Sequence, residues 1–204
     1  MPKIIWEGNK SRFGTDHKSP PLPENAVKLR DADGFIAKAL PYGIAPVLIC
    51  MLAVFLKAFI NREPPIDPLF LIPAFIIGSA VALPLHELTH AVCYPKGATV
   101  WVGLCLRKAA AYAISYCPLP KTRFIIMSLA PAILGIIPLV IFAAAPIEWK
   151  PLLTLCIVPA FCGLISPCPD YMDVISVLRQ APANAVIRDS EDGLYFYAEN
   201  AAQL

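Results

Sequence analysis

Charged side chains are scarce in this chain. Asp, Glu, Lys and Arg make up 16% of its 204 residues, whereas soluble domains average about 25%. Hydrophobic residues account for 57% and the mean hydropathy is +0.62, which together exclude an ordinary soluble domain. Because a bilayer core about 30 Å thick needs roughly 20 apolar residues per helix, long charge-free runs predict membrane spans. Four such runs occur, at residues 39–56, 68–85, 124–147 and 151–169.

Other features that are missing exclude further classes of protein. The net charge is only +2 and no nucleic-acid-binding motif occurs, so we expect no nucleic acid partner. Seven cysteines lie in or near apolar segments without any CxxC pair, which indicates reduced, small apolar residues. The first 35 residues are polar and proline-bearing, so no cleavable signal peptide is expected and the first span would act as its own insertion signal.

The expected fold is an all-α membrane protein with about four transmembrane helices, a small interfacial β-hairpin and a short C-terminal helix and hairpin. Apolar, β-prone runs at 99–106 and 110–117 predict the interfacial hairpin, and alternation over 186–197 predicts the second. The predicted domains are a cytoplasmic polar tail (1–34), a transmembrane domain (35–180) and a cytoplasmic C-terminal tail (181–204). The predicted spans are 35–60, 69–94, 124–147 and 151–166.

The distribution of Lys and Arg predicts the orientation. Six lie in the N-terminal tail and five in the 95–123 loop, whereas the two connections on the other side carry only Arg62 and Lys150. By the positive-inside rule, both termini and the long loop of this integral membrane protein are cytoplasmic. The cytoplasmic end of the second span carries His86, so a site there would be reached from the cytosol.

The strongest motif is the sequence His86-Glu87-Leu88-Thr89-His90 at that end. Two histidines four residues apart lie on one helical face and can bind one Zn²⁺, while the glutamate between them can reach a metal-bound water. A catalytic zinc needs a third protein ligand. Asp170 and Asp173 lie at the matching depth after the fourth span, with Cys168 a weaker candidate, whereas Glu148 is in a turn on the opposite side.

These motifs resemble the DUF3267 family of zincin-type peptidases over roughly residues 69–197. The likeness is carried by HELTHAV, by the run from Arg123 to Pro131, by Pro169-Asp170 before a helix, and by residues 186–189. More distantly the chain is similar to the site-2 protease class, although it has no LDG-type motif and no PDZ-like domain. The resemblance implies zinc held by His86, His90 and Asp170, with Asp173 in reserve, and Glu87 as general base in peptide hydrolysis.

The expected function is therefore that of a zinc-dependent membrane metalloprotease, a hydrolase that cleaves peptide bonds of a membrane-protein or peptide substrate at or within the lipid bilayer. A substrate helix must unwind before attack, and the edge of the 99–117 hairpin could receive the unwound strand. Two alternatives remain. One is a non-catalytic protein with a structural zinc site, in which Cys168 or Asp173 supplies a fourth ligand. The other is a metal transporter, although no internal repeat is present and the site lies near one face.

Overall fold

The computed structural model describes residues 1–11 and 16–198, which form two compact units. Helices account for 56% of the described residues and strands for 20%, so the fold is mixed and the all-α prediction is wrong. The error begins at the N-terminus, where two strands form in the segment predicted to be a polar tail. Because both strands pair with residues far along the chain, the local pattern of residues 1–34 does not reveal them.

The first unit draws on Met1–Ala39, Glu87–Ala130 and Pro169–Leu204 and contains two sheets. The hairpin predicted at 99–117 is confirmed, and β1 joins it as a parallel strand beside β3. The hairpin predicted at 186–197 is also confirmed, and it is extended by an outer strand on each side. In spatial order the sheets are β1 (Lys3–Asn9), β3 (Thr99–Cys105) and β4 (Ala110–Ile114), and β2 (Val27–Asp31), β7 (Gly193–Ala198), β6 (Ala185–Ser190) and β5 (Leu119–Pro120).

Four helices belong wholly or mainly to this unit: α1 (Phe35–Ala39), α4 (His86–Cys93), α5 (Lys121–Leu129) and α8 (Cys168–Gln180). The apolar sides of α4, α5 and α8 share one buried core with the strands, which fixes the helices that carry the candidate site. Its members include Ala91, Tyr94, Val100, Val102, Leu119, Phe124, Met127, Val177, Ile187 and Leu194.

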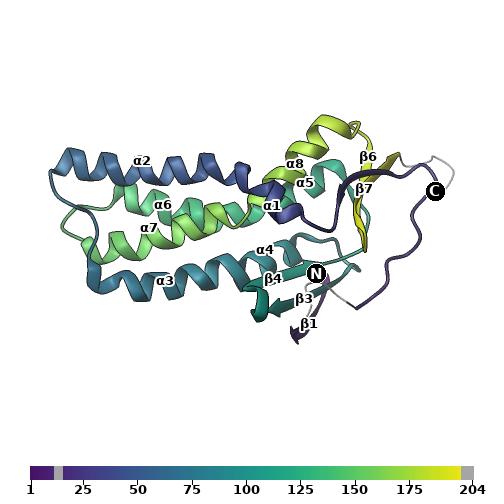
Figure 1. The fold of residues 1–204 in the computed structure, drawn as a ribbon, viewed down its shortest axis with the longest axis horizontal. Coiled ribbons are helices and arrows are strands. Elements are labelled where there is room, and N and C mark those ends of the chain that lie inside the picture. Colours follow the sequence, from purple (N-terminus) through teal and green to yellow (C-terminus); the bar gives the residue numbers. More distant parts are fainter. Residues whose placement is uncertain (12–15, 199–204) are drawn as a thin grey trace. The chain divides into compact units, whose positions relative to one another are not determined.

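The second unit is a bundle of helices around α7 (Lys150–Ile165), which packs against the other three (Figure 1). These are α2 (Ile44–Asn61), α3 (Leu71–Ala80) and α6 (Ile133–Ala144). Gly135 of α6 and Gly163 of α7 let the two backbones touch, because a Cβ built on Gly163 would lie 2.6 Å from the Gly135 nitrogen. Lys57 of α2 donates hydrogen bonds to the carbonyls of Ala143 and Ala145 at the end of α6, where helical carbonyls lack backbone partners.

The outer helices of this bundle carry unusually many exposed apolar side chains. Large Leu, Ile, Met and Phe residues are exposed along α2, α3 and α6, whereas the described part of α7 exposes none. Three helical segments, Phe35–Asn61, Pro68–Cys93 and Lys121–Ala144, are long and apolar enough to cross a membrane. The pair Lys150–Ile165 and Cys168–Gln180, bent by 41°, makes a fourth if it counts as one span.

Candidate metal centre

A local irregularity sets the direction of the HELTH helix. Residues Val81–Leu85 form a π-helical turn around Pro84, and the His86 N–H bonds back to the carbonyl of Val81. A proline has no N–H to donate and displaces the preceding turn, so the wider turn relieves its clash. One extra residue in a helix rotates all later residues of that helix by about 100°. The π-turn therefore decides which way both histidines of α4 face.

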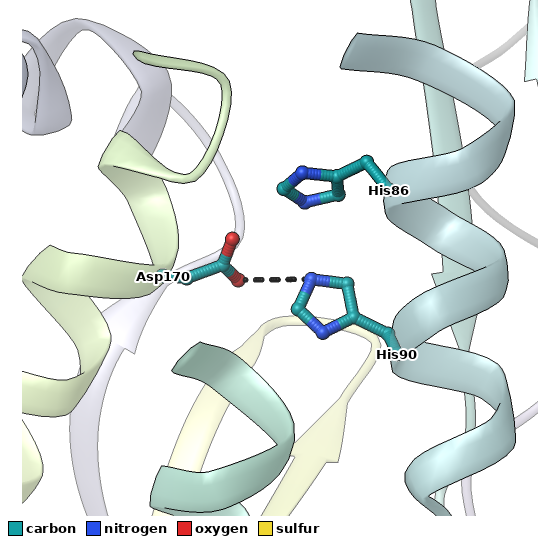
Figure 2. Close-up of side chains that lie close together, drawn as sticks. All are labelled: His86, His90 and Asp170. Atoms are coloured by element: carbon teal, nitrogen blue, oxygen red, sulfur yellow. Dashed lines mark ion pairs between the residues drawn. The ribbon is translucent and has the colours of Figure 1, made fainter. Parts of the chain in front are cut away.

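The structure brings His86, His90 and Asp170 together, as Figure 2 shows. The two imidazoles project from successive turns of α4, and the Asp170 carboxylate approaches them from the first turn of α8. One ligand atom from each residue lies within 4.8 Å of the other two, and both histidines are buried. The His90 Nε2 atom is 3.3 Å from Asp170 Oδ1, an ion pair within the first unit.

Hydrogen bonds orient both imidazoles. The His90 Nδ1–H donates to the Met127 carbonyl oxygen at 3.0 Å, because a carbonyl can only accept, and this leaves Nε2 directed at Asp170. The Met127 carbonyl is available because its α-helical donor would be residue 131, which is a proline. The His86 Nδ1 lies 3.2 Å from the Ser166 hydroxyl, at the end of α7. Such outer contacts commonly fix ring orientation in metal-binding histidines.

The three residues fit a zinc ion in both chemistry and spacing. Two nitrogens and one carboxylate oxygen are the donor set of many catalytic zinc sites, which keep a fourth position open. With bonds near 2.1 Å, tetrahedral zinc separates two ligand atoms by about 3.4 Å. The 3.3 Å between His90 and Asp170 matches that separation. Among the residues that the structure describes, this is the one group of three or more such side chains close enough to share a metal.

Asp173, predicted as the reserve ligand, is used elsewhere. Its two carboxylate oxygens lie 2.7 and 2.9 Å from Arg30 Nε, and the side chain is buried. Asp189 of β6 lies 3.9 Å from the Arg30 Nη2 atom. Desolvation raises the pKa of the Asp189 carboxyl, and the positive charges of Arg30 and of a protonated His90 oppose that rise. Cys168 is buried at the start of α8 and is not part of the His86, His90 and Asp170 group.

Glu87 is half-buried and follows His86 directly in α4. Its charge acts on both His90 and Tyr94, which places it in the electrostatic surroundings of the histidines. The end of α4 is held by Arg123 of α5, whose guanidinium donates to the Cys93 carbonyl at 3.0 and 3.2 Å. Together with the bond between His90 and Met127, this contact ties α4 to α5 at two points.

Several supporting residues were missed in the sequence. In the sequence Arg30 is one charge among several in the tail, and its partner Asp173 lies 143 residues away, so no local pattern links them. Ser166 carries no signal beyond its place before Pro167. A signal did exist for the Met127 carbonyl and for the π-turn, because Pro131 and Pro84 each remove a backbone donor inside a helical run.

A helix that carries two buried histidines with a glutamate beside the first, facing a carboxylate from a second helix, has the residue arrangement typical of zincin-type centres. Residues 79–186 match the model of family DUF3267, whose description is "Putative zincin peptidase". The match covers more than half of the chain, so the protein belongs to this family, as its motifs indicated. Comparison with curated proteins and with solved structures gave no match.

Proposed function

We propose that the protein is an integral membrane zinc metallopeptidase that hydrolyses peptide bonds at or within the membrane. The observation that carries this proposal is the approach of Asp170 to His90 at 3.3 Å, with His86 one turn earlier on the same helix. Three ligands leave a coordination position for catalysis, whereas a structural zinc site is usually closed by four. The family assignment supports the same chemistry.

In this proposal His86, His90 and Asp170 hold the ion, and Glu87 acts as general base. When bound, zinc supplies a Lewis acid that polarises the scissile carbonyl and makes water more acidic. Glu87 takes the proton of the attacking water and passes it to the leaving amine. The Met127 carbonyl and the Ser166 hydroxyl keep the two imidazoles aligned while this proton moves.

The proposed location is a membrane, with both termini and the site on the cytoplasmic side. Three segments have the length and apolar character of spans, and the apolar side chains exposed on α2, α3 and α6 would otherwise face water. Eleven Lys and Arg in the N-terminal tail and the 95–123 loop, against two in the opposite connections, favour this orientation. The proposed substrate is a membrane protein or peptide, which must unwind before its amides can be attacked.

The substitution Glu87→Gln tests the proposal. Glutamine keeps the size of the side chain but cannot act as a base, so about one zinc per chain should remain while cleavage falls about 100-fold or more. The measurements are metal content and turnover of candidate single-span substrates by protein reconstituted in lipid vesicles. Glu148→Gln, in the exposed connection before α7, makes the same chemical change as a control and should leave both values unchanged.

Other outcomes favour the alternatives. A structural zinc site predicts bound zinc without turnover in either form, and a transporter predicts metal flux that depends on His86, His90 and Asp170 more than on Glu87. The wild-type protein, purified without chelator, should hold more zinc than the His86→Ala/His90→Ala variant. Equal zinc content in the two would exclude zinc binding at this site. Undiminished cleavage by the Glu87→Gln protein would refute the proposed base.

A further inference from the structure

A partly buried ion pair joins the N-terminal strand β2 to helix α8. Arg30 of β2 contacts both carboxylate oxygens of Asp173 through its Nε, and the two side chains are 19% and 9% exposed. The guanidinium also lies over the Phe35 ring, 4.4 Å from its centroid, and faces Asp189 of β6. Arg30 is therefore held by residues from three elements around it, all in the first unit.

The same helix α8 carries both Asp173 and the candidate ligand Asp170. Residues three apart lie on one side of a helix, so a contact that fixes Asp173 also fixes the rotation of Asp170 about the helix axis. A side-chain oxygen lies about 5 Å from the axis, so a rotation of roughly 10° moves it by about 0.9 Å. Zinc ligand distances tolerate only about 0.2 Å. A small rotation of α8 would therefore be enough to move the Asp170 carboxylate out of bonding distance of a zinc ion.

Charge alone predicts the opposite effect. Arg30 is the cation among three acidic residues that act on one another electrostatically, Asp170, Asp173 and Asp189. If Arg30 acted only through its charge, removing it would make the surroundings more negative and would strengthen the binding of a divalent cation. If it acts by holding α8, removing it weakens metal binding. The two roles therefore differ in the sign of the change.

We propose that Arg30 is a positioning residue of the metal centre, which acts through Asp173 to keep Asp170 directed at His90. A residue before the first apolar run then contributes to metal binding, although it lies outside residues 79–186, which match the family model. This inference rests on the proposed function only in requiring that His86, His90 and Asp170 hold zinc.

The test uses the purified full-length protein and measures its zinc dissociation constant by competition with a chelating dye. Arg30→Met and Asp173→Asn should each raise the constant roughly 10-fold or more, and the double variant should be no worse than either one. Lys28→Met is the matched control, because Lys28 is in the same strand and makes its ion pairs with exposed carboxylates. Its dissociation constant should equal that of the wild type.

A second measurement separates positioning from general loss of stability. Co²⁺ in place of zinc has a visible spectrum that depends on ligand geometry, and this spectrum should change in Arg30→Lys but not in Lys28→Met. Arg30→Lys also decides the matter if Arg30→Met does not fold, because it keeps the charge while losing the guanidinium. We expect weaker zinc binding by Arg30→Lys, less severe than by Arg30→Met.

Several results would overturn the inference while leaving the metallopeptidase proposal intact. These are unchanged or tighter zinc binding in Arg30→Met, a wild-type dissociation constant and Co²⁺ spectrum in Arg30→Lys, and fully additive effects of the Arg30 and Asp173 substitutions. A wild-type protein that binds no zinc would instead exclude the proposed function, and this inference with it.

Discussion

The bond between His90 and Met127 depends on Pro131, which has no N–H to donate to the Met127 carbonyl. The Met127 carbonyl accepts His90 Nδ1–H, and it also lies within reach of the Ala130 N–H at the end of α5. A carbonyl oxygen has two lone pairs, so the His90 and Ala130 donors use its full capacity to accept hydrogen bonds. Pro131→Ala would create a third donor, the residue 131 N–H, in the α-helical position for the same oxygen.

The expected result is a more regular helix and a weaker site. Replacing a proline in a helix removes a penalty of up to about 3 kcal/mol, so unfolding should not become easier. Competition for the Met127 oxygen frees the His90 ring to turn. Loss of such an outer contact typically reduces metal affinity 10- to 100-fold, equivalent to about 1.4 to 2.7 kcal/mol.

The assay is the zinc dissociation constant measured together with the thermal unfolding midpoint in detergent. Pro138→Ala is the control, because Pro138 lies inside α6 and its replacement adds no donor beside Met127. We expect weaker zinc binding by Pro131→Ala alone, without a fall in its midpoint. If Pro131→Ala binds zinc as the wild type does, the Met127 carbonyl does not orient His90 in the way described.

Three further predictions concern packing, ligands and topology. Gly163→Ala should lower the thermal unfolding midpoint by several degrees, because the added Cβ would meet the Gly135 backbone and overpacking costs about 1 to 3 kcal/mol. An unchanged midpoint would mean that α6 and α7 are less close than described. Asp170→Ala should weaken zinc binding more than Asp173→Ala, and the reverse order would make Asp173 the ligand. Cysteines placed at positions 107 and 108 should be labelled only from the cytoplasmic side, and labelling from outside would contradict the orientation.

Features encoded locally were predictable. The four predicted spans, 35–60, 69–94, 124–147 and 151–166, begin and end within three residues of helical segments in the structure, because a long apolar helix is a property of continuous sequence. Both hairpins were found for the same reason, since each pairs neighbouring strands. The HELTH spacing places two histidines on one side of any helix, and the Pro169-Asp170 junction placed the carboxylate at the start of the next.

Features that depend on distant partners were not predictable. Strand β1 has the mixed sequence KIIWEGN within a polar tail, and its hydrogen-bonding partner β3 lies nearly a hundred residues later. Strand β2 similarly depends on β7. The contact of Arg30 with Asp173 follows from the pairing of β2 with β7, so a residue with the appearance of an ordinary tail charge is partly buried near the candidate metal centre.

The pairing of early and late segments has a consequence for biosynthesis. Arg30 leaves the ribosome 143 residues before Asp173, which at about 5 to 20 residues per second is a delay of roughly 7 to 30 s. During that interval α4 with both histidines has been made, but the helix that carries Asp170 has not. The growing chain therefore cannot complete the candidate metal centre until both histidines and several apolar helices have been synthesised. A truncated translation product that ends before α8 would lack Asp170.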